Sequence, residues 1–314
     1  MAQIVKASVR DAYGKTLVEL CQENKNIVVL DADLSKSTRT NLCAAAFPER
    51  FFDIGIAEQN MIGIAAGLAA AGKTVFASTF AVFAPGRCYD QIRLSVAQPH
   101  LNVKIVTTHG GLTVGEDGAS HQATEDLALI CALPGFHVVV PADAIETAQA
   151  VRVAANTSGP FYIRLSRLEL PIVHSNDYQF QLGKAFVLRQ GKDATIIAAG
   201  VMVAAALQAA DELQAQNISC RVLNMSTVKP IDEAAIIAAA RETGAIVTAE
   251  EHQENGGLGS IIARVVARNR PVPMSFIAIK DVFGESGKPD ELLHKYGLTA
   301  ADIVREVHSV IARK

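Results

Sequence analysis

Short runs of β-branched residues alternate with longer helical patterns along this chain, and the alternation constrains the fold more than any other feature. In the first half, the runs IVVLDA, TVFAST, VKIVTT, HVVVP and FYIRLS stand between segments of helical periodicity. Such alternation predicts βαβ units and a parallel sheet covered by helices on both faces. We expect the helices at residues 6–23, 57–71, 86–98, 123–132 and 143–155.

The same alternation begins again after a polar stretch at about residues 171–184, which is the expected linker. The apolar runs ATIIAAG, CRVLNM, AIVTAE and MSFIAI follow, with helical segments between them. The chain has 314 residues, half of them hydrophobic, so two domains can each bury a core. The predicted fold class is therefore α/β, with two mostly parallel sheets covered by helices, in domains 1–178 and 179–314.

Composition excludes several classes of protein. The net charge is −3, and no Lys/Arg cluster stands beside aromatic residues, so nucleic acid is not an expected partner. The five cysteines are scattered singly without C-x-x-C spacing, which favours neither zinc nor disulfides. They are expected to be small buried side chains in a reducing compartment.

The N-terminal sequence MAQIVKASVRDAYGKTL lacks the apolar core of a signal peptide, so we expect a cytoplasmic chain. The apolar stretch at 59–72 is shorter than the roughly 18 residues of a membrane span, so no membrane association is expected. Its small residues, GIAAGLAAAG, allow close approach of another helix. The stretch is therefore expected to lie in a core or in a subunit contact.

Three predicted strand ends carry polar residues: DADLSKST, HGGLTVGEDGASHQ and RLSRLELP. Ligands of open parallel sheets bind where the carboxyl ends of the strands lead into loops. We expect all three segments along one edge of the first domain. The candidates for a common site are Asp33, Ser37, His109, Asp117, His121, Arg164 and Arg167.

Glu58 opens a strongly apolar helical segment. It can be a first-turn carboxylate stabilised by the helix dipole. Alternatively, desolvation among isoleucines and alanines would raise its pKa, which suits proton sharing with a bound heterocycle. The residues alone leave both interpretations open.

His109 and His121 stand twelve positions apart, with no third histidine or cysteine near them. A catalytic zinc site usually takes three protein ligands, so the alternative of a polar pocket is favoured. In such a pocket imidazoles donate hydrogen bonds to oxygens of a polyhydroxylated or phosphorylated substrate. Arg167 fits either a surface ion pair or anion binding, whereas spacing alone indicates a solvated Arg10.

Other motifs give no support for different chemistry. The turn EEHQENGGLGSII lacks the G-x-G-x-x-G spacing of a dinucleotide site, so tight helix packing is the favoured interpretation. The spacing G-x-x-x-x-G-K-[ST] occurs as GLAAAGKT at residues 67–74, but there it leads from a predicted helix into the run TVFAST, whereas a phosphate-binding loop leads from a strand into a helix. The sequence contains no G-x-S-x-G elbow. ATP hydrolysis and serine hydrolase chemistry are therefore unsupported.

Three segments together, IGIAEQNMIGIAAGLA, STFAVFAPGRCYDQIR and THGGLTVGEDGASHQATEDLAL, resemble the pyrimidine-binding domain of transketolases. The second half, with TVKPID, EEHQENGGLGS and FGESGKPDELL, resembles the C-terminal domain of the same family. The resemblance covers essentially the whole chain. It implies a transferase that moves a two-carbon ketol unit from a ketose to an aldose with thiamine diphosphate as cofactor.

The resemblance also implies roles for individual residues. Glu58 matches the glutamate that hydrogen-bonds a ring nitrogen of the aminopyrimidine, which makes it catalytic as well as cofactor-binding. His109 and His121 match residues that hydrogen-bond the substrate and its carbonyl oxygen, so they too are expected to be catalytic. The implied cofactor contacts are Glu58, Phe80, Phe83, Asp33 and Tyr89, and the implied contacts to a sugar phosphate are Arg10, Ser37, His109, Asp117, His121 and Arg167.

A full-length transketolase carries a G-D-G motif that binds Mg²⁺ and the diphosphate, and this sequence contains none. The chain thus resembles the C-terminal subunit of a split transketolase. An N-terminal partner subunit is expected to hold Mg²⁺, with no metal ligand on this chain. The resemblance further implies self-association in an α2β2 heterotetramer and, by default, the pentose phosphate pathway.

Two related enzymes and one different class of protein are alternatives. A 1-deoxyxylulose-phosphate synthase would carry all its domains in one chain. The beta chain of a 2-oxo-acid dehydrogenase decarboxylase component shares the domain order, but GEDGASHQ and the arginines fit a sugar substrate better. A non-catalytic transketolase-like partner protein would keep the fold without the chemistry.

Overall fold

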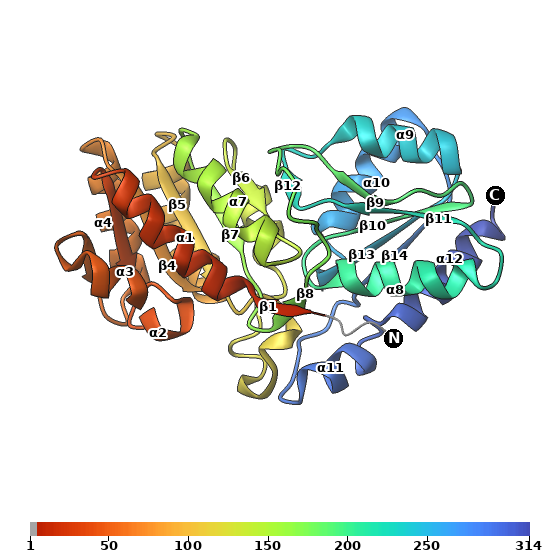
Figure 1. Cartoon of the computed structure of the whole chain (residues 1–314), viewed down its shortest axis with the longest axis horizontal. Coiled ribbons are helices and arrows are strands. Elements are labelled where there is room, and N and C mark those ends of the chain that lie inside the picture. Colours follow the sequence, from red (N-terminus) through yellow and green to blue (C-terminus); the bar gives the residue numbers. More distant parts are fainter. Residues whose placement is uncertain (1–4) are drawn as a thin grey trace.

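The computed structural model describes residues 5–314, which form two α/β halves side by side (Figure 1). The first half contains a seven-stranded sheet of order β12-β6-β7-β5-β4-β2-β3, parallel except for β12. Its strands are β2 (Ile27–Asp31), β3 (Phe51–Asp53), β4 (Thr74–Phe80), β5 (Val103–Thr108), β6 (His137–Val139), β7 (Phe161–Arg164) and β12 (Thr227–Lys229).

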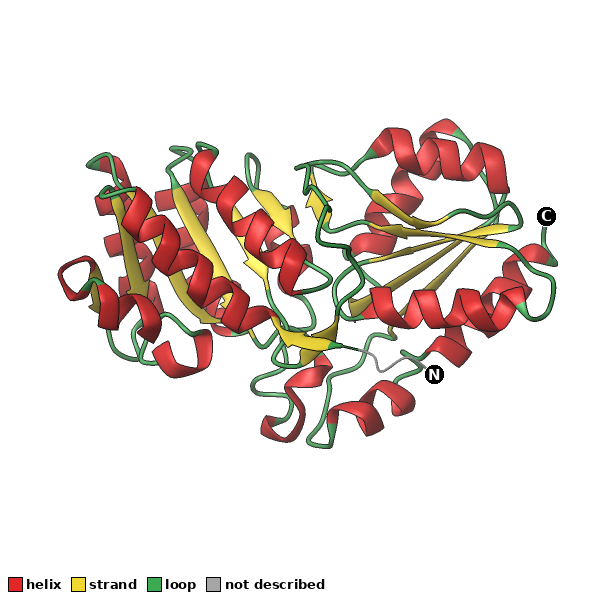
Figure 2. Cartoon of the chain, viewed as in Figure 1, coloured by secondary structure: helices red, strands yellow, loops and turns green. Residues whose placement is uncertain are grey.

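Helices cover both faces of this sheet (Figure 2). One face packs against α1 and α7, and the other against α4, α5 and α6. The helices of this half are α1 (Val9–Glu23), α2 (Ser35–Thr38), α3 (Asn41–Ala46), α4 (Glu58–Ala70), α5 (Phe83–Gln91), α6 (Asp126–Cys131) and α7 (Ala144–Asn156). Shorter turns are η1 (Pro48–Arg50), the π-helix η2 (Ile92–Ala97) and the 3₁₀ helix η3 (Leu112–Asp117).

The second half contains a five-stranded sheet of order β14-β13-β10-β11-β9, parallel except for β9. Its strands are β9 (Phe186–Arg189), β10 (Ala194–Ala198), β11 (Cys220–Asn224), β13 (Ile246–Gln253) and β14 (Met274–Ile279). Its helices are α8 (Met202–Gln214), α9 (Glu233–Thr243), α10 (Leu258–Asn269), α11 (Pro289–Lys295) and α12 (Ala300–Ile311).

The two halves share buried apolar surface. One hydrophobic cluster joins α4, α5 and α6 of the first half to α9 and α10 of the second, through residues such as Ile130, Val138 and Ile262. In addition, β12 comes from the second half of the sequence but pairs antiparallel with β6. Residues 172–185 have neither helix nor strand, whereas Pro171, at the start of the expected linker 171–184, ends β8. The domain boundary between residues 178 and 179 stays a prediction.

The predicted α/β class and its parallel sheets are confirmed. Residues 6–8 were expected in a helix but form strand β1 (Lys6–Ser8), which pairs with β8 (Glu169–Pro171). Helix α1 starts after them because the Ser8 side chain accepts a hydrogen bond from the Asp11 backbone N–H (3.1 Å) and caps the helix.

The helix predicted at 86–98 begins earlier, at Phe83, and changes to π geometry at Ile92. The helix predicted at 123–132 is shorter and spans Asp126–Cys131. Strands β3, β9 and β12 were not predicted; they are edge strands and lack the continuous apolar run that marks a strand buried on both faces.

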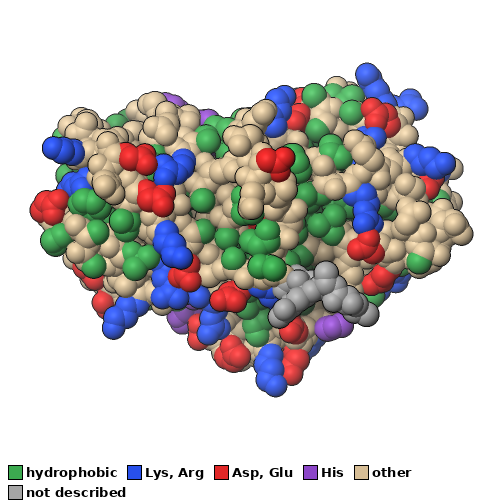
Figure 3. All heavy atoms as spheres, in the orientation of Figure 1, with side chains coloured by type: hydrophobic (Ala, Val, Ile, Leu, Met, Phe, Trp, Pro, Cys, Tyr) green, Lys and Arg blue, Asp and Glu red, His purple; other side chains and the backbone are tan. Residues whose placement is uncertain are grey.

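No helix among residues 5–314 is long and apolar enough to cross a membrane. On the face drawn in Figure 3, the lysine and arginine side chains lie among aspartates and glutamates. They form no continuous basic surface on that face.

Candidate active site

The carboxyl ends of four adjacent parallel strands carry the predicted residues. Asp33 follows β2, Phe80 ends β4, His109 follows β5 and Arg167 follows β7, and these strands are neighbours in the order β7-β5-β4-β2. Parallel strands end at the same edge of a sheet, which is the usual ligand position in this class of fold. The predicted convergence at one sheet edge is thus seen in the topology.

Four rings pack together at this edge. The ring of Phe80 stacks on that of His109, with centroids 3.8 Å apart, and lies 5.8 Å from the ring of Phe83. The imidazole of His121 meets Phe80 and Phe83 edge-on, at 6.3 and 5.3 Å. Two aromatic rings from residues 80–83 and two imidazoles from residues 109–121 therefore form one wall of the candidate site.

His109 is a neutral imidazole in this wall. Burial, reinforced by the positive charges of Arg10 and Arg167, lowers its pKa from 6.5 to about 3. Its Nδ1 lies 2.8 Å from the Thr108 hydroxyl. When that hydroxyl donates to Nδ1, Nε2 carries the proton and can donate to a ligand oxygen. His109 is thus a hydrogen-bond donor without charge at neutral pH.

Residues 109–122, here called the histidine loop, are held by the second half of the chain. The buried carboxyl of Glu251, on β13, accepts hydrogen bonds from the Thr113 backbone N–H and from its hydroxyl (3.2 Å). Gly111 passes over this carboxyl with φ +82°, and a Cβ there would lie 2.2 Å from the Glu251 Cδ. Burial raises the pKa of Glu251 to about 7. Sequence reasoning missed Glu251; its only signal in the sequence is that two adjacent glutamates, Glu250 and Glu251, stand in a strand that begins with apolar residues.

Arg164, a predicted site residue, makes contacts that hold parts of the fold together. Its buried guanidinium pairs with Asp126 (2.9 Å) and donates to the carbonyls of Ala123 (2.9 Å) and Glu251 (3.0 Å). These contacts join β7 to α6, to Ala123 directly after the histidine loop and to β13. The guanidinium therefore fixes the loop and the domain contact.

Arg10, Ser37 and Arg167 form a second group of contacts, and both arginines are near enough to His109 to lower its pKa. Arg10 donates from Nη1 to the Ser37 carbonyl (2.9 Å), and its buried Nε makes no hydrogen bond within residues 5–314. Burial, and then the charge of Arg39, lower the pKa of Arg10, with Arg167 contributing in the same direction. Arg167 donates to the Val114 carbonyl and pairs with Glu116 (3.2 Å). Cations this close are stabilised by an anionic ligand.

The segment after β2 is organised by Asp31 and not by the predicted Asp33. The buried Asp31 carboxylate accepts hydrogen bonds from Thr38 (2.7 Å), Thr40 (2.8 Å) and the Leu34 N–H (2.7 Å), and burial raises its pKa to about 6. Asp33 is exposed, with φ +61°, and its N–H donates to Asp53. Asp31 therefore sets the shape of the loop that carries Ser37.

Two predicted residues lie outside this group of contacts. Asp117 is exposed at the end of η3 and faces solvent. Tyr89 lines a separate groove of about 710 Å³ together with Arg93, Leu94 and Pro134. The structure does not bring Tyr89 together with the four-ring wall.

Glu58 is the first residue of α4 and its side chain is 4% exposed. It borders a surface hollow of about 420 Å³, lined by Ile56, Ala57, Gln59, Asn60 and Arg87. Glu58 is buried, as expected, but polar side chains as well as apolar ones surround it. Nη1 of Arg87 lies 2.8 and 3.0 Å from the two carboxylate oxygens.

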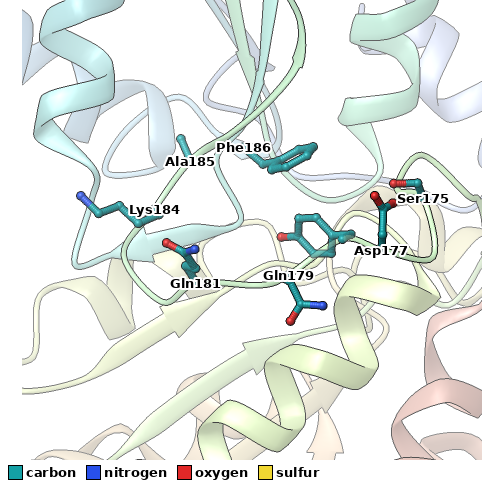
Figure 4. Close-up of a pocket in the computed structure, with 8 residues that line it drawn as sticks. Ser175, Asp177, Gln179, Gln181, Lys184, Ala185 and Phe186 are labelled. Atoms are coloured by element: carbon teal, nitrogen blue, oxygen red, sulfur yellow. The ribbon is translucent and has the colours of Figure 1, made fainter.

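A further hollow of about 390 Å³ lies on the linker, away from the strand ends (Figure 4). Ser175, Asp177, Tyr178, Gln179, Gln181, Lys184, Ala185 and Phe186 line it. It contains none of the predicted site residues. Among residues 5–314, no three His, Cys, Asp or Glu side chains come together as a metal site.

Residues 5–173 match the model described as the pyrimidine binding domain of transketolase, and residues 183–303 match the transketolase C-terminal domain. The chain is 48% identical to the putative transketolase C-terminal section of Methanocaldococcus jannaschii, over 96% of each chain. It is 45% identical to a 6-deoxy-6-sulfo-D-fructose transketolase subunit of Clostridium sp., over 98% of this chain and 95% of that one. A solved split gene transketolase, described as an inactive beta4 tetramer, has 55% identity and a TM-score of 0.92, covering 98% of this chain and 99% of its own.

Proposed function

This chain belongs to the transketolase family, and from that premise we propose that it is the C-terminal subunit of a split, thiamine-diphosphate-dependent transketolase. The proposed reaction transfers a two-carbon ketol unit from a ketose phosphate to an aldose phosphate. The subunit acts with an N-terminal subunit. The relatives support this proposal, since two that match nearly end to end are named as a section or a subunit of a transketolase.

The observation that carries the proposal is the pairing of a buried carboxylate with a wall of rings. Glu58 opens toward a hollow, and Phe80 and Phe83 stand at the end of β4 and the start of α5. A carboxylate that can accept from a ring nitrogen, close to aromatic surface, fits an aminopyrimidine. Thiamine diphosphate, when bound, supplies the carbanion chemistry that makes and breaks a bond beside a carbonyl.

The chain's own residues then have separate tasks. Glu58 holds the pyrimidine and exchanges a proton with it. The neutral His109 donates from Nε2 to the substrate oxygen that gains negative charge, and His121, at the same wall, makes a second contact. The exposed Asp117 accepts from a sugar hydroxyl.

Arg10, Ser37 and Arg167 bind the phosphate of the sugar. The Nε of Arg10 has no hydrogen-bond partner among residues 5–314, and the charges of Arg39 and Arg167 lower the pKa of Arg10. Both observations support this assignment, because a phosphate would accept from the Nε and offset the repulsion. Asp33 lies at the cofactor edge in this proposal. Tyr89, on α5, lines the separate groove described above and has no role in this proposal.

The proposed assembly is an α2β2 heterotetramer whose N-terminal subunits hold Mg²⁺ and the diphosphate, in the cytoplasm and with pentose phosphates as default substrates. A neighbour of 55% identity is described as an inactive beta4 tetramer, which supports self-association of such chains without catalysis. This subunit supplies the pyrimidine and sugar contacts, and the partner completes the site.

The test begins with recovery of the tagged chain from its host with thiamine diphosphate and Mg²⁺, and identification of any stoichiometric partner by mass spectrometry. Ketol transfer is then measured for the assembled wild type, Glu58→Ala and the exposed control Glu212→Ala. We expect a loss of at least 100-fold for Glu58→Ala and none for the control. Wild-type rates for Glu58→Ala, or a chain that returns without a partner or cofactor, would favour the non-catalytic alternative.

A further inference from the structure

The carboxylate of Glu58 is occupied by a side chain of the same polypeptide. Nη1 of Arg87 reaches both oxygens, at 2.8 and 3.0 Å, and the guanidinium carbon lies 3.9 Å from the centre of the Phe83 ring. One guanidinium thus makes a charged hydrogen bond and a cation–π contact at the same time. Both contacts are to residues that the proposed function assigns to the aminopyrimidine.

The backbone of Arg87 is held in place, whereas its side chain is half exposed. The Gln59 amide nitrogen donates to the Arg87 carbonyl (2.9 Å), and α5 is kinked at the next residue, Cys88 (φ −116°, ψ 17°). The Arg87 side chain is 47% exposed, whereas that of Glu58 is 4% exposed. The guanidinium can therefore leave toward solvent, and the carboxylate cannot follow it.

Resting on the proposed function, we propose that Arg87 is a positioning residue that occupies the pyrimidine subsite until thiamine diphosphate displaces it. In the chain without cofactor, Arg87 keeps Glu58 oriented and supplies the donor that a buried carboxylate needs. The planar guanidinium also covers the face of Phe83. A ring bound to Glu58 and Phe83 replaces both contacts, and the arginine moves into solvent.

To bind, the cofactor must break the two contacts of the Arg87 guanidinium, and the free energy of these contacts is subtracted from the free energy of cofactor binding. A half-exposed ion pair and an exposed cation–π contact are both weak, so their combined effect on affinity is about 5- to 30-fold. Removing the guanidinium removes this competition and leaves Glu58 without a donor until the pyrimidine arrives. Arg87→Met is therefore expected to bind the cofactor more tightly than the wild type.

The experiment measures the Kd of thiamine diphosphate, at saturating Mg²⁺, by isothermal titration calorimetry on the complex with the N-terminal subunit. Wild type, Arg87→Met and Arg87→Lys are compared with Arg270→Met, an exposed arginine of the second half. We expect a Kd about 5- to 30-fold lower for Arg87→Met, an intermediate value for Arg87→Lys and no change for the control. Raising the salt concentration should bring the wild-type and Arg87→Met values together, because salt screens the ion pair that only the wild type has.

The possible results separate this inference from the proposed function. If wild type binds the cofactor and Arg87→Met binds it equally or less tightly, Arg87 is not a competitor, although the enzyme assignment stands. Arg87→Lys provides the same comparison if the methionine variant does not fold. If the wild-type complex binds no thiamine diphosphate, the proposed function fails and this inference fails with it.

Discussion

Replacing Glu251 with glutamine tests how the histidine loop is attached to the second half of the chain. The Glu251 carboxyl is buried, accepts two hydrogen bonds from Thr113 and has its pKa raised by burial from 4.5 to about 7. Glutamine keeps the size of the side chain and an acceptor for the Thr113 N–H, but it has no proton to lose. The variant thus removes the titration and preserves the packing.

The sign of the effect follows from proton binding. Between pH 4.5 and about pH 7 the folded carboxyl keeps its proton, whereas the unfolded one has lost it. Wild-type stability therefore falls as the pH rises through this range, and the contribution is constant above it. Each pH unit corresponds to about 1.4 kcal/mol, so this carboxyl costs the wild-type chain about 3 kcal/mol of unfolding free energy at pH 8 relative to pH 4.

Urea unfolding followed by circular dichroism, from pH 4 to pH 8, measures the effect. The unfolding free energy of Glu251→Gln minus that of wild type should increase by about 3 kcal/mol across the range. The exposed control Glu212→Gln should stay within a few tenths of a kcal/mol of wild type. A difference between Glu251→Gln and wild type that does not change with pH would refute a buried, protonated Glu251.

Two further predictions concern the loop and the anion end. Gly111→Ala places a Cβ against the Glu251 carboxyl at a residue with φ +82°. We therefore expect the unfolding free energy, measured by thermal unfolding, to fall by about 1–3 kcal/mol, and proteolysis within residues 109–122 to be faster. Gly67→Ala, on an open face of α4, is the control, and equal stability of the two variants would contradict the clash. Arg167→Ala in the assembled enzyme should raise the KM for a sugar phosphate about tenfold or more and leave the KM for an unphosphorylated sugar within about twofold of wild type. The control is Arg152→Ala, which removes a surface ion pair with Glu23. An equal rise in KM for both sugars would exclude a phosphate contact at Arg167.

The sheet edge could be predicted from the sequence, because buried parallel strands appear as continuous apolar runs and polar segments follow three of them. His109 and Arg167 were found in this way. The roles of Phe80 and Phe83 came only from the family resemblance, since phenylalanines in apolar surroundings carry no signal of a cofactor wall. In the structure, it is their contacts with His109 and His121 that distinguish them from core residues.

The partners of the site residues could not be predicted. Arg87 stands 29 positions after Glu58, and Glu251 stands 138 positions after Thr113. Sequence spacing within one element says nothing about contacts made by separate elements. Asp31 and Asp33 are two positions apart and would share a face of an extended strand, so periodicity does not separate them. The strand ends at Asp31, and the backbone at Asp33 turns to φ +61°, which leaves Asp33 exposed.

Strand β12 affects the order in which the first half can be completed during synthesis. Its three residues, 227–229, form the edge of the seven-stranded sheet beyond β6. A nascent chain that has emerged only to the linker still presents the unpaired side of β6, with its valines at 138 and 139, and an uncovered strand edge is a template for aggregation. A recombinant fragment that stops at the linker would carry the same exposed edge permanently. The smallest unit expected to remain monodisperse therefore extends past residue 229.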